Sequence, residues 1–191
     1  MSLDKATHIR SYFERLKAVL DSVKIEDVEK LISIFEDAFQ RDAVVFVCGN
    51  GGSWSTASHW VCDFSKGAST SGKRRFRMFA LGDNVPMLTA YGNDVSYNSI
   101  FAEPLRAYAR PGDVVVLITA SGNSPNILEA AVAARELKTT VVGLIGFGGG
   151  KLAAMTDHNV IVESREYGPV EDLHLVLDHI VSTYMKEFIA K

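Results

Sequence analysis

The sequence is poor in cysteine and has no long apolar run. Its 191 residues include two cysteines, Cys48 and Cys62, without the paired spacing of a zinc finger. A chain of this length buries a core without disulfides, so we expect free thiols, with Cys48 buried. No apolar run approaches the length of a membrane-spanning helix, and the first residues lack the apolar core of a signal sequence. The sequence therefore predicts a cytoplasmic protein that does not contact membranes.

An excess of charge of either sign is also missing. The formal net charge is -3, from 20 Lys and Arg against 23 Asp and Glu. The basic run Lys73-Arg74-Arg75 with Arg77 is a weak nucleic-acid signal, and we interpret it as a solvated loop. Apolar residues (47%) and charged residues (23%) are as frequent as in an ordinary globular domain. We therefore expect no nucleic-acid partner and a chain that folds as one domain over residues 1–191.

Hydrophobic periodicity divides the chain into a helical segment, residues 1–41, and an alternating core, residues 42–191. Residues 5–40 carry apolar side chains at helical spacing, and a break near Asp21-Ser22 indicates two helices or one kinked helix. Beyond them, five short apolar runs alternate with helical patterns, which predicts an α/β fold with a five-stranded parallel sheet covered by helices on both faces. The predicted strands span residues 43–48, 76–81, 114–118, 140–145 and 159–162, and the predicted helices span residues 53–66, 85–93 with 97–108, 124–137, 151–155 and 170–189.

The first strand ends in the glycine-rich turn Gly49-Asn50-Gly51-Gly52-Ser53, which leads directly into a helix. Glycines let backbone N–H groups approach a ligand closely, and the start of a helix favours an anion. Tight turns in any α/β fold use glycine as well, so this turn alone is weak evidence. It has neither the lysine of a nucleotide P-loop nor the spacing of a dinucleotide-binding fingerprint.

The third strand ends in a second polar turn, Thr119-Ala120-Ser121-Gly122-Asn123-Ser124-Pro125. Three hydroxyl groups and the N–H groups of a helix start suit a phosphate monoester, which offers three acceptor oxygens. Helix capping alone would explain Ser124 and Pro125, but it leaves Thr119 and Ser121 unexplained. Because ligands of open α/β sheets bind beyond the carboxyl ends of the strands, we expect both turns to line one phosphate site.

Ionisable residues gather on two of the predicted helices. His59 and Asp63 are four residues apart and share a helical face, where they can bind a divalent metal, act as a proton-transfer pair or simply face solvent. The last helix carries a dense group of acids and histidines in an otherwise apolar segment, which hints at a functional site. Spacing alone does not choose its functional histidine. The group comprises Glu171, Asp172, His174, Asp178 and His179.

A third polar turn, Tyr91-Gly92-Asn93-Asp94, follows a short predicted helix. Asn93 and Asp94 can cap the next helix or hydrogen-bond to the hydroxyl groups of a sugar. Both interpretations stay open on the residues alone.

Five motifs in register make the chain resemble the SIS-domain phosphoheptose isomerases, over nearly its whole length. The resemblance implies a doubly wound, flavodoxin-like sheet and homotetramers with active sites at subunit junctions. It also implies interconversion of sedoheptulose 7-phosphate with D-glycero-D-manno-heptose 7-phosphate. The motifs are Gly49-Asn50-Gly51-Gly52-Ser53, Gly92-Asn93-Asp94 with Phe101, Arg110-Pro111-Gly112-Asp113-Val114, Ser121-Gly122-Asn123-Ser124 and Gly149-Gly150-Lys151-Leu152.

The resemblance carries roles over to individual residues. It implies that Asp63 and His179 are catalytic, and that a zinc ion is held by His59, Asp63, Glu171 and His179. Two histidines and two carboxylates suit a divalent ion of this kind. The substrate and phosphate would be bound by Asn50, Gly51, Gly52, Ser53, Asn93, Asp94, Thr119, Ser121, Asn123, Ser124 and Glu171.

Three positions depart from the family pattern. Asp63 stands where the family usually has Glu, Glu171 where it has Gln, and Ala120 where it has Thr. Asp is one methylene shorter than Glu, and a carboxylate in place of an amide adds negative charge that favours a cation. We expect a phosphosugar isomerase that works by acid–base enolisation. The alternative is a non-catalytic SIS protein that binds a phosphosugar or a protein partner such as the replication initiator; retention of His179 argues for catalysis.

Overall fold

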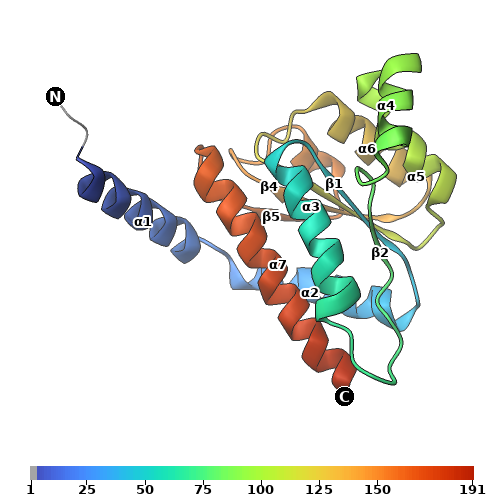
Figure 1. Cartoon of the computed structure of the whole chain (residues 1–191), viewed down its shortest axis with the longest axis horizontal. Coiled ribbons are helices and arrows are strands. Elements are labelled where there is room, and N and C mark those ends of the chain that lie inside the picture. Colours follow the sequence, from blue (N-terminus) through green and yellow to red (C-terminus); the bar gives the residue numbers. More distant parts are fainter. Residues whose placement is uncertain (1–3) are drawn as a thin grey trace.

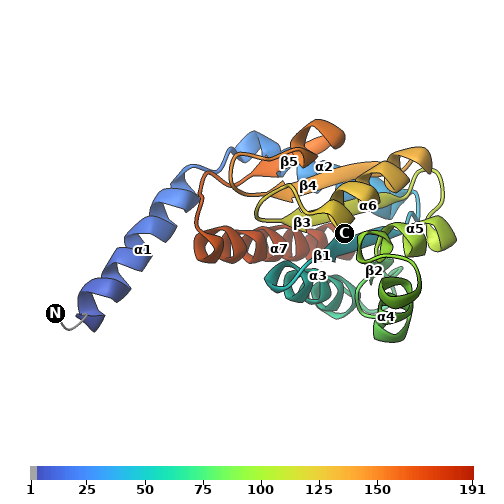
Figure 2. The same cartoon turned by 90° about the horizontal axis from the view of Figure 1, so that it is seen from above.

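The computed structural model of the chain describes residues 4–191. Its two N-terminal helices are α1 (Lys5–Asp21) and α2 (Ile25–Gln40), so the break in periodicity separates two helices. The Asp4 carboxylate caps α1 by accepting a hydrogen bond from the Thr7 N–H at 3.0 Å. Helix α1 projects from the body of the molecule, whereas α2 packs against it (Figures 1 and 2).

A five-stranded parallel sheet forms the centre of the fold, as the sequence predicts. The strand order is β2-β1-β3-β4-β5, which is the doubly wound order of flavodoxin-like folds. Strands β1 and β3 lie side by side, with Val45 opposite Val114 and Gly49 opposite Ile118. The chain leaves this pair toward opposite edges of the sheet. The strands are β1 (Val45–Gly49), β2 (Met78–Ala80), β3 (Val114–Thr119), β4 (Thr140–Ile145) and β5 (His158–Ile161).

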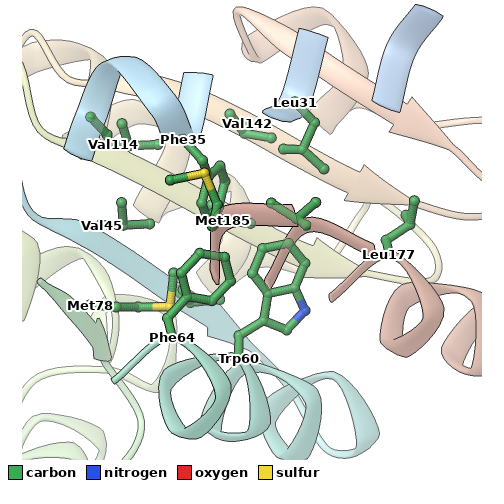
Figure 3. Packing of buried hydrophobic residues seen from close by; sticks show 14 of the residues in the cluster. Leu31, Phe35, Val45, Trp60, Phe64, Met78, Val114, Val142, Leu177 and Met185 are labelled. Atoms are coloured by element: carbon green, nitrogen blue, oxygen red, sulfur yellow. The ribbon is translucent and has the colours of Figure 1, made fainter. Parts of the chain in front are cut away.

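Helices cover both faces of the sheet. On one face α2, α3 (Gly52–Cys62) and α7 (Tyr167–Ala190) pack against one set of alternating strand residues. Figure 3 shows this core, in which Phe35, Trp60 and Leu177 come from the three helices. On the other face α5 (Ala102–Tyr108) and α6 (Pro125–Glu136) cover the alternate strand residues. Strands β1, β3 and β4 are therefore buried on both sides, which explains their continuous apolar runs, whereas the edge strands β2 and β5 are only partly buried.

Three segments differ from the predicted helices. The helix predicted for residues 53–66 divides into α3 and a π-helical turn, η1 (Asp63–Gly67). The pattern at residues 85–108 divides into α4 (Val85–Asp94), the 3₁₀ turn η2 (Tyr97–Ser99) and α5, and the segment 151–155 forms the 3₁₀ turn η3 (Leu152–Met155). Hydrophobic spacing over so few residues does not separate α, 3₁₀ and π turns.

The point where the strand order reverses lies between β1 and β3, and ligands of such sheets bind beyond the carboxyl ends of these strands. Helices α3 and α7 run side by side along one face at this point (Figure 1). Within residues 4–191, none of the helices combines the length and the apolar composition needed to cross a bilayer.

Candidate active site

The two polar turns meet in one cavity beyond the carboxyl ends of β1 and β3, as predicted. The cavity holds about 120 Å³ and takes its lining from both turns and from the start of α7. A larger hollow of about 460 Å³ at the β2 edge has a chiefly apolar lining, including Phe46, Phe79 and Met87, and lies away from both turns. The smaller cavity is lined by Asn50, Ser53, Thr119, Ala120, Ser121, Ser124, Tyr167 and Glu171. We call it the hydroxyl pocket.

The first turn reaches the hydroxyl pocket because two glycines allow its backbone path. Gly51 has φ 55°, a conformation that glycine adopts without steric cost, and it precedes the first turn of α3. A Cβ at Gly52 would lie 2.5 Å from the Glu171 carboxylate, so a larger residue there would have to displace that side chain. The N–H groups at the start of α3 and the buried Ser53 side chain thus lie together at this side of the pocket.

The second turn presents its hydroxyl groups to the same pocket. Ser124 is the N-cap residue of α6, and Pro125 is its first residue. Within the described residues, the Ser124 hydroxyl forms no capping hydrogen bond with this helix. The capping interpretation of Ser124 is therefore not supported. Thr119 Oγ1 accepts from the Gly122 N–H at 3.3 Å, and Ser121 Oγ accepts from the Asn123 N–H at 3.2 Å. These bonds fix both side chains while leaving their O–H groups as donors.

An amide pair that the sequence analysis missed holds Asn50, one of the residues that line the pocket. Asn50 Nδ2 donates to Asn126 Oδ1 at 2.9 Å, and Asn126 Nδ2 donates back to Asn50 Oδ1 at 2.8 Å. The Tyr97 hydroxyl also donates to Asn50 Oδ1, at 3.3 Å. Asn126 is 2% exposed and locks the side chain of Asn50. The one signal in the sequence is an amide among the small and apolar residues at the start of α6.

Three predicted substrate-binding residues are engaged elsewhere. Asn123 ties two loops together, donating to the Ser121 carbonyl at 2.8 Å and accepting from the Lys151 N–H at 3.2 Å. Asn93 and Asp94 lie at the end of α4, where the Asn93 amide donates to the Asp94 carboxylate at 2.7 Å, and neither lines the hydroxyl pocket. They do not cap the next helical turn either, since Ser96 does so.

A second polar group lies between α3 and α7, and its members are His59, Asp63, Asp178 and His179. We call it the His–Asp cluster. His59 and His179 bring their Nε2 atoms to 3.4 Å, and Asp63 Oδ2 lies 3.7 and 3.8 Å from these two nitrogens. The π-helical turn begins at Asp63, a feature that is frequent at functional sites. The sequence thus predicts three of the four members.

The His–Asp cluster fits a divalent metal. Tetrahedral ligand atoms about 2.1 Å from a zinc ion lie about 3.4 Å apart. The separations of 3.4, 3.7 and 3.8 Å among His59, Asp63 and His179 are close to this value. All four residues can place one ligand atom within 4.8 Å of the others. Imidazole and carboxylate donors suit zinc and similar ions.

Helix α7 carries two buried ionisable side chains near this cluster in the sequence. Asp178 belongs to the cluster, and His174 does not. Burial, with a contribution from the Asp63 charge, raises the pKa of Asp178 to about 8. Burial alone lowers the pKa of His174 to about 4. Both side chains are 0% exposed, and within residues 4–191 neither has a hydrogen-bond partner.

Glu171, the fourth ligand expected from the resemblance, is not a member of the His–Asp cluster within the described chain. Its carboxylate lies against Gly52 and lines the hydroxyl pocket. Glu171 precedes His179 by eight residues, about 12 Å along α7, and its carboxylate lies at the first turn of α3. This place suits the expected contact with substrate, and the expected role of Glu171 as a metal ligand stays a prediction.

The chain is similar to known proteins over most of its length. A family model described as SIS domain matches residues 11–146. The phosphoheptose isomerase of Mycobacterium tuberculosis (strain ATCC 25177 / H37Ra) is 37% identical over 166 residues, which cover 87% of this chain and 84% of that protein. The phosphoheptose isomerase of Rhodospirillum rubrum is 39% identical over 137 residues, 72% of each chain. The structure of phosphoheptose isomerase from Neisseria gonorrhoeae superposes with a TM-score of 0.89 at 28% identity, covering 96% of this chain and 100% of that one.

Proposed function

This chain belongs to the SIS domain family and is a phosphosugar isomerase, and we propose that it interconverts sedoheptulose 7-phosphate and D-glycero-D-manno-heptose 7-phosphate. The observation that carries the proposal is the pairing of two polar sites on α3 and α7. The hydroxyl pocket offers donors for a phosphate, and the His–Asp cluster offers groups that move protons. Relatives named phosphoheptose isomerase support the choice of a seven-carbon substrate.

In the proposed binding mode, the phosphate lies in the hydroxyl pocket. Ser53, Ser121 and Ser124 would donate to its oxygens, together with the N–H groups at the starts of α3 and α6. Asn50, held by Asn126, would donate to or accept from a sugar hydroxyl. Asn93 and Asp94 keep their proposed role at the sugar only if substrate or a second subunit brings them near, since they lie outside the pocket.

The proposed reaction is an enolisation in which the chain only moves protons. Asp63 or His179 takes a proton from C1 of the ketose while the oxygen on C2 gains one, which gives an enediol. C2 then receives a proton and the hydroxyl on C1 loses one, which leaves the aldose. Atoms and electrons balance without an oxidant or a second substrate. Asp63 Oδ2 and His179 Nε2 lie 3.8 Å apart, so a substrate placed beside them would have both groups near C1 and C2.

We also propose zinc as the resident metal of the His–Asp cluster. A bound divalent ion polarises a carbonyl oxygen and stabilises the charge that develops on it. His59 and His179 would hold the ion, and Asp63 would serve as ligand or as base.

The test is isomerisation of sedoheptulose 7-phosphate by metal-stripped and by zinc-restored protein, followed in D₂O by proton exchange at C1. We expect exchange that requires zinc and that His179→Ala abolishes, because that variant removes a proton carrier and a metal ligand together. Ser33→Ala, at an exposed position of α2 far from both sites along the chain, is the control.

The opposite result is equally informative. Folded protein that binds this ketose phosphate and others but never exchanges the C1 proton would contradict enolisation. It would favour a phosphosugar-binding or partner-binding role.

We further propose that the chain acts as a homotetramer. Helix α1 projects from the body and exposes Ile9 (52%) and Phe13 (55%), apolar side chains that another subunit would cover (Figure 2). Light scattering should give four times the 20.9 kDa mass of the chain, and Phe13→Ser should shift the protein to smaller assemblies. A wild-type mass of one chain would contradict the proposal.

A further inference from the structure

Asp178 is a carboxylate in a place that ordinarily excludes one. It lies on α7 between Leu177 and His179, is 0% exposed, and neither of its oxygens has a hydrogen-bond partner within the described chain. Burying an unpaired carboxylate costs several kcal/mol, so such groups are paired or bind a metal. The Asp178 carboxylate therefore needs a partner from outside the described chain.

The missing partner has a defined place. One oxygen of Asp178 lies within 4.8 Å of the ligand atoms of His59, Asp63 and His179. Asp178 and Asp63 thus bring two carboxylates together beside two imidazoles. Two carboxylates this close repel each other when both are charged, and a cation between them would relieve the repulsion.

Glu171 is the competing ligand, and its position argues against it. Its carboxylate oxygens lie 2.5 and 2.7 Å from where a Cβ on Gly52 would be, at the first turn of α3. Seven residues separate Gly52 from His59, which corresponds to about 10 Å along that helix. Glu171 therefore lies about two turns from the cluster on α3 as well as on α7, and in the hydroxyl pocket instead.

We propose that Asp178, in place of Glu171, completes the divalent-metal site with His59, Asp63 and His179. The division of labour follows from the two positions: Asp178 binds the ion, and Glu171 faces the substrate. This inference rests on the proposed metal-dependent function, but metal binding tests it independently of turnover.

The experiment measures zinc affinity by competition with a chromophoric chelator, on the full-length metal-stripped protein. Asp178→Asn should weaken zinc binding by at least about 100-fold, because loss of even an indirect ligand partner costs 10- to 100-fold. Glu171→Ala, which removes the competing ligand on the same helix, should change zinc affinity by less than about threefold. Visible absorption of the cobalt(II) form should change in Asp178→Asn and stay the same in Glu171→Ala.

A second variant guards against misfolding. Asp178→Leu replaces the buried carboxylate with an apolar side chain of suitable size, so the metal-free protein should fold with undiminished stability and still lose zinc. Weaker zinc binding in Glu171→Ala, alone or together with Asp178→Asn, would overturn the assignment. So would unchanged affinity in both Asp178 variants.

The outcomes also separate this inference from the proposed function. Zinc-dependent isomerisation with unchanged zinc affinity in Asp178→Asn would leave the function standing and remove Asp178 from the site. Zinc binding through Asp178 without isomerisation of any ketose phosphate would do the reverse.

Discussion

The hydroxyl pocket and the His–Asp cluster share α3 and α7 but are built in opposite ways. The pocket draws its lining from turns of consecutive residues, such as Gly51 to Ser53, that follow strands of the sheet. The cluster draws on single side chains from two helices about 120 residues apart, His59 and His179 among them. The pocket therefore depends on strand ends and turn chemistry, and the cluster on how α3 and α7 pack.

This difference in construction matches a difference in expected role. Backbone N–H groups and hydroxyls hold an anion without changing protonation state. Imidazoles and carboxylates bind metals and transfer protons. If the two regions are separate in function, changes in the pocket alter KM and changes in the cluster alter kcat.

The largest expected effect comes from the cluster. His59→Ala should lower kcat by about 10² to 10⁴-fold while KM for the phosphosugar changes by less than about threefold, because the variant removes a proposed metal ligand beside the proton-transfer residues and leaves the phosphate contacts intact. Steady-state kinetics of the zinc-restored protein check this. A rise in KM with unchanged kcat would mean that the cluster binds substrate, and the comparison of the two regions would fail.

The contrast in construction also explains what the sequence predicts well. Five apolar runs such as Val114–Ile118 predict the parallel strands, and the polar residues after two of them predict the pocket, because all these signals are contiguous. Ser124 and Pro125 identify the start of α6 within one residue. The position of a strand fixes where the side chains of the following turn lie, and the strands give the strongest signal in this sequence.

The features that the sequence leaves open have a common physical cause. Glu171 and Asp178 both lie on α7, and choosing between them requires knowing how the helix is placed against α3, which tertiary packing decides. The π-helical turn at Asp63 and the partnership of Asn50 with Asn126, 76 residues apart, likewise depend on long-range contacts. Spacing along one helix shows which residues share a face, but it does not show which other element that face packs against.

His174 offers a sharper test, since it lies on α7 between Glu171 in the pocket and Asp178 in the cluster. Its pKa of about 4 in the folded protein is below its unfolded value of 6.5, so below pH 6.5 the unfolded chain binds a proton that the folded chain does not. His174 therefore costs stability as the pH falls. Between pH 7 and 5, metal-free wild type should lose about 2 kcal/mol more than His174→Gln, measured by urea unfolding.

The comparison controls for other titrating groups. Asp178 is present in both wild type and His174→Gln, so its contribution to the free energy of unfolding cancels in the difference. Equal pH dependence of wild type and His174→Gln would mean that the ring is hydrated or charged when folded. Water or charge would then reach the part of α7 that lies between the hydroxyl pocket and the His–Asp cluster.

The smallest expected effect tests the pocket. Ser124 is an N-cap residue whose hydroxyl is free of the α6 backbone, so Ser124→Ala should remove a phosphate donor at little cost to the helix. A hydrogen bond to a charged group contributes about 1.5–3 kcal/mol, which predicts a rise in KM of about tenfold or more with kcat nearly unchanged. Urea unfolding should show a loss of stability well below the ~1 kcal/mol of a working N-cap.

A drop in kcat at constant KM would place Ser124 in the chemical step. A large loss of stability at constant KM would restore the capping interpretation. Either result would remove the division between a pocket that holds the phosphate and a cluster that moves the proton.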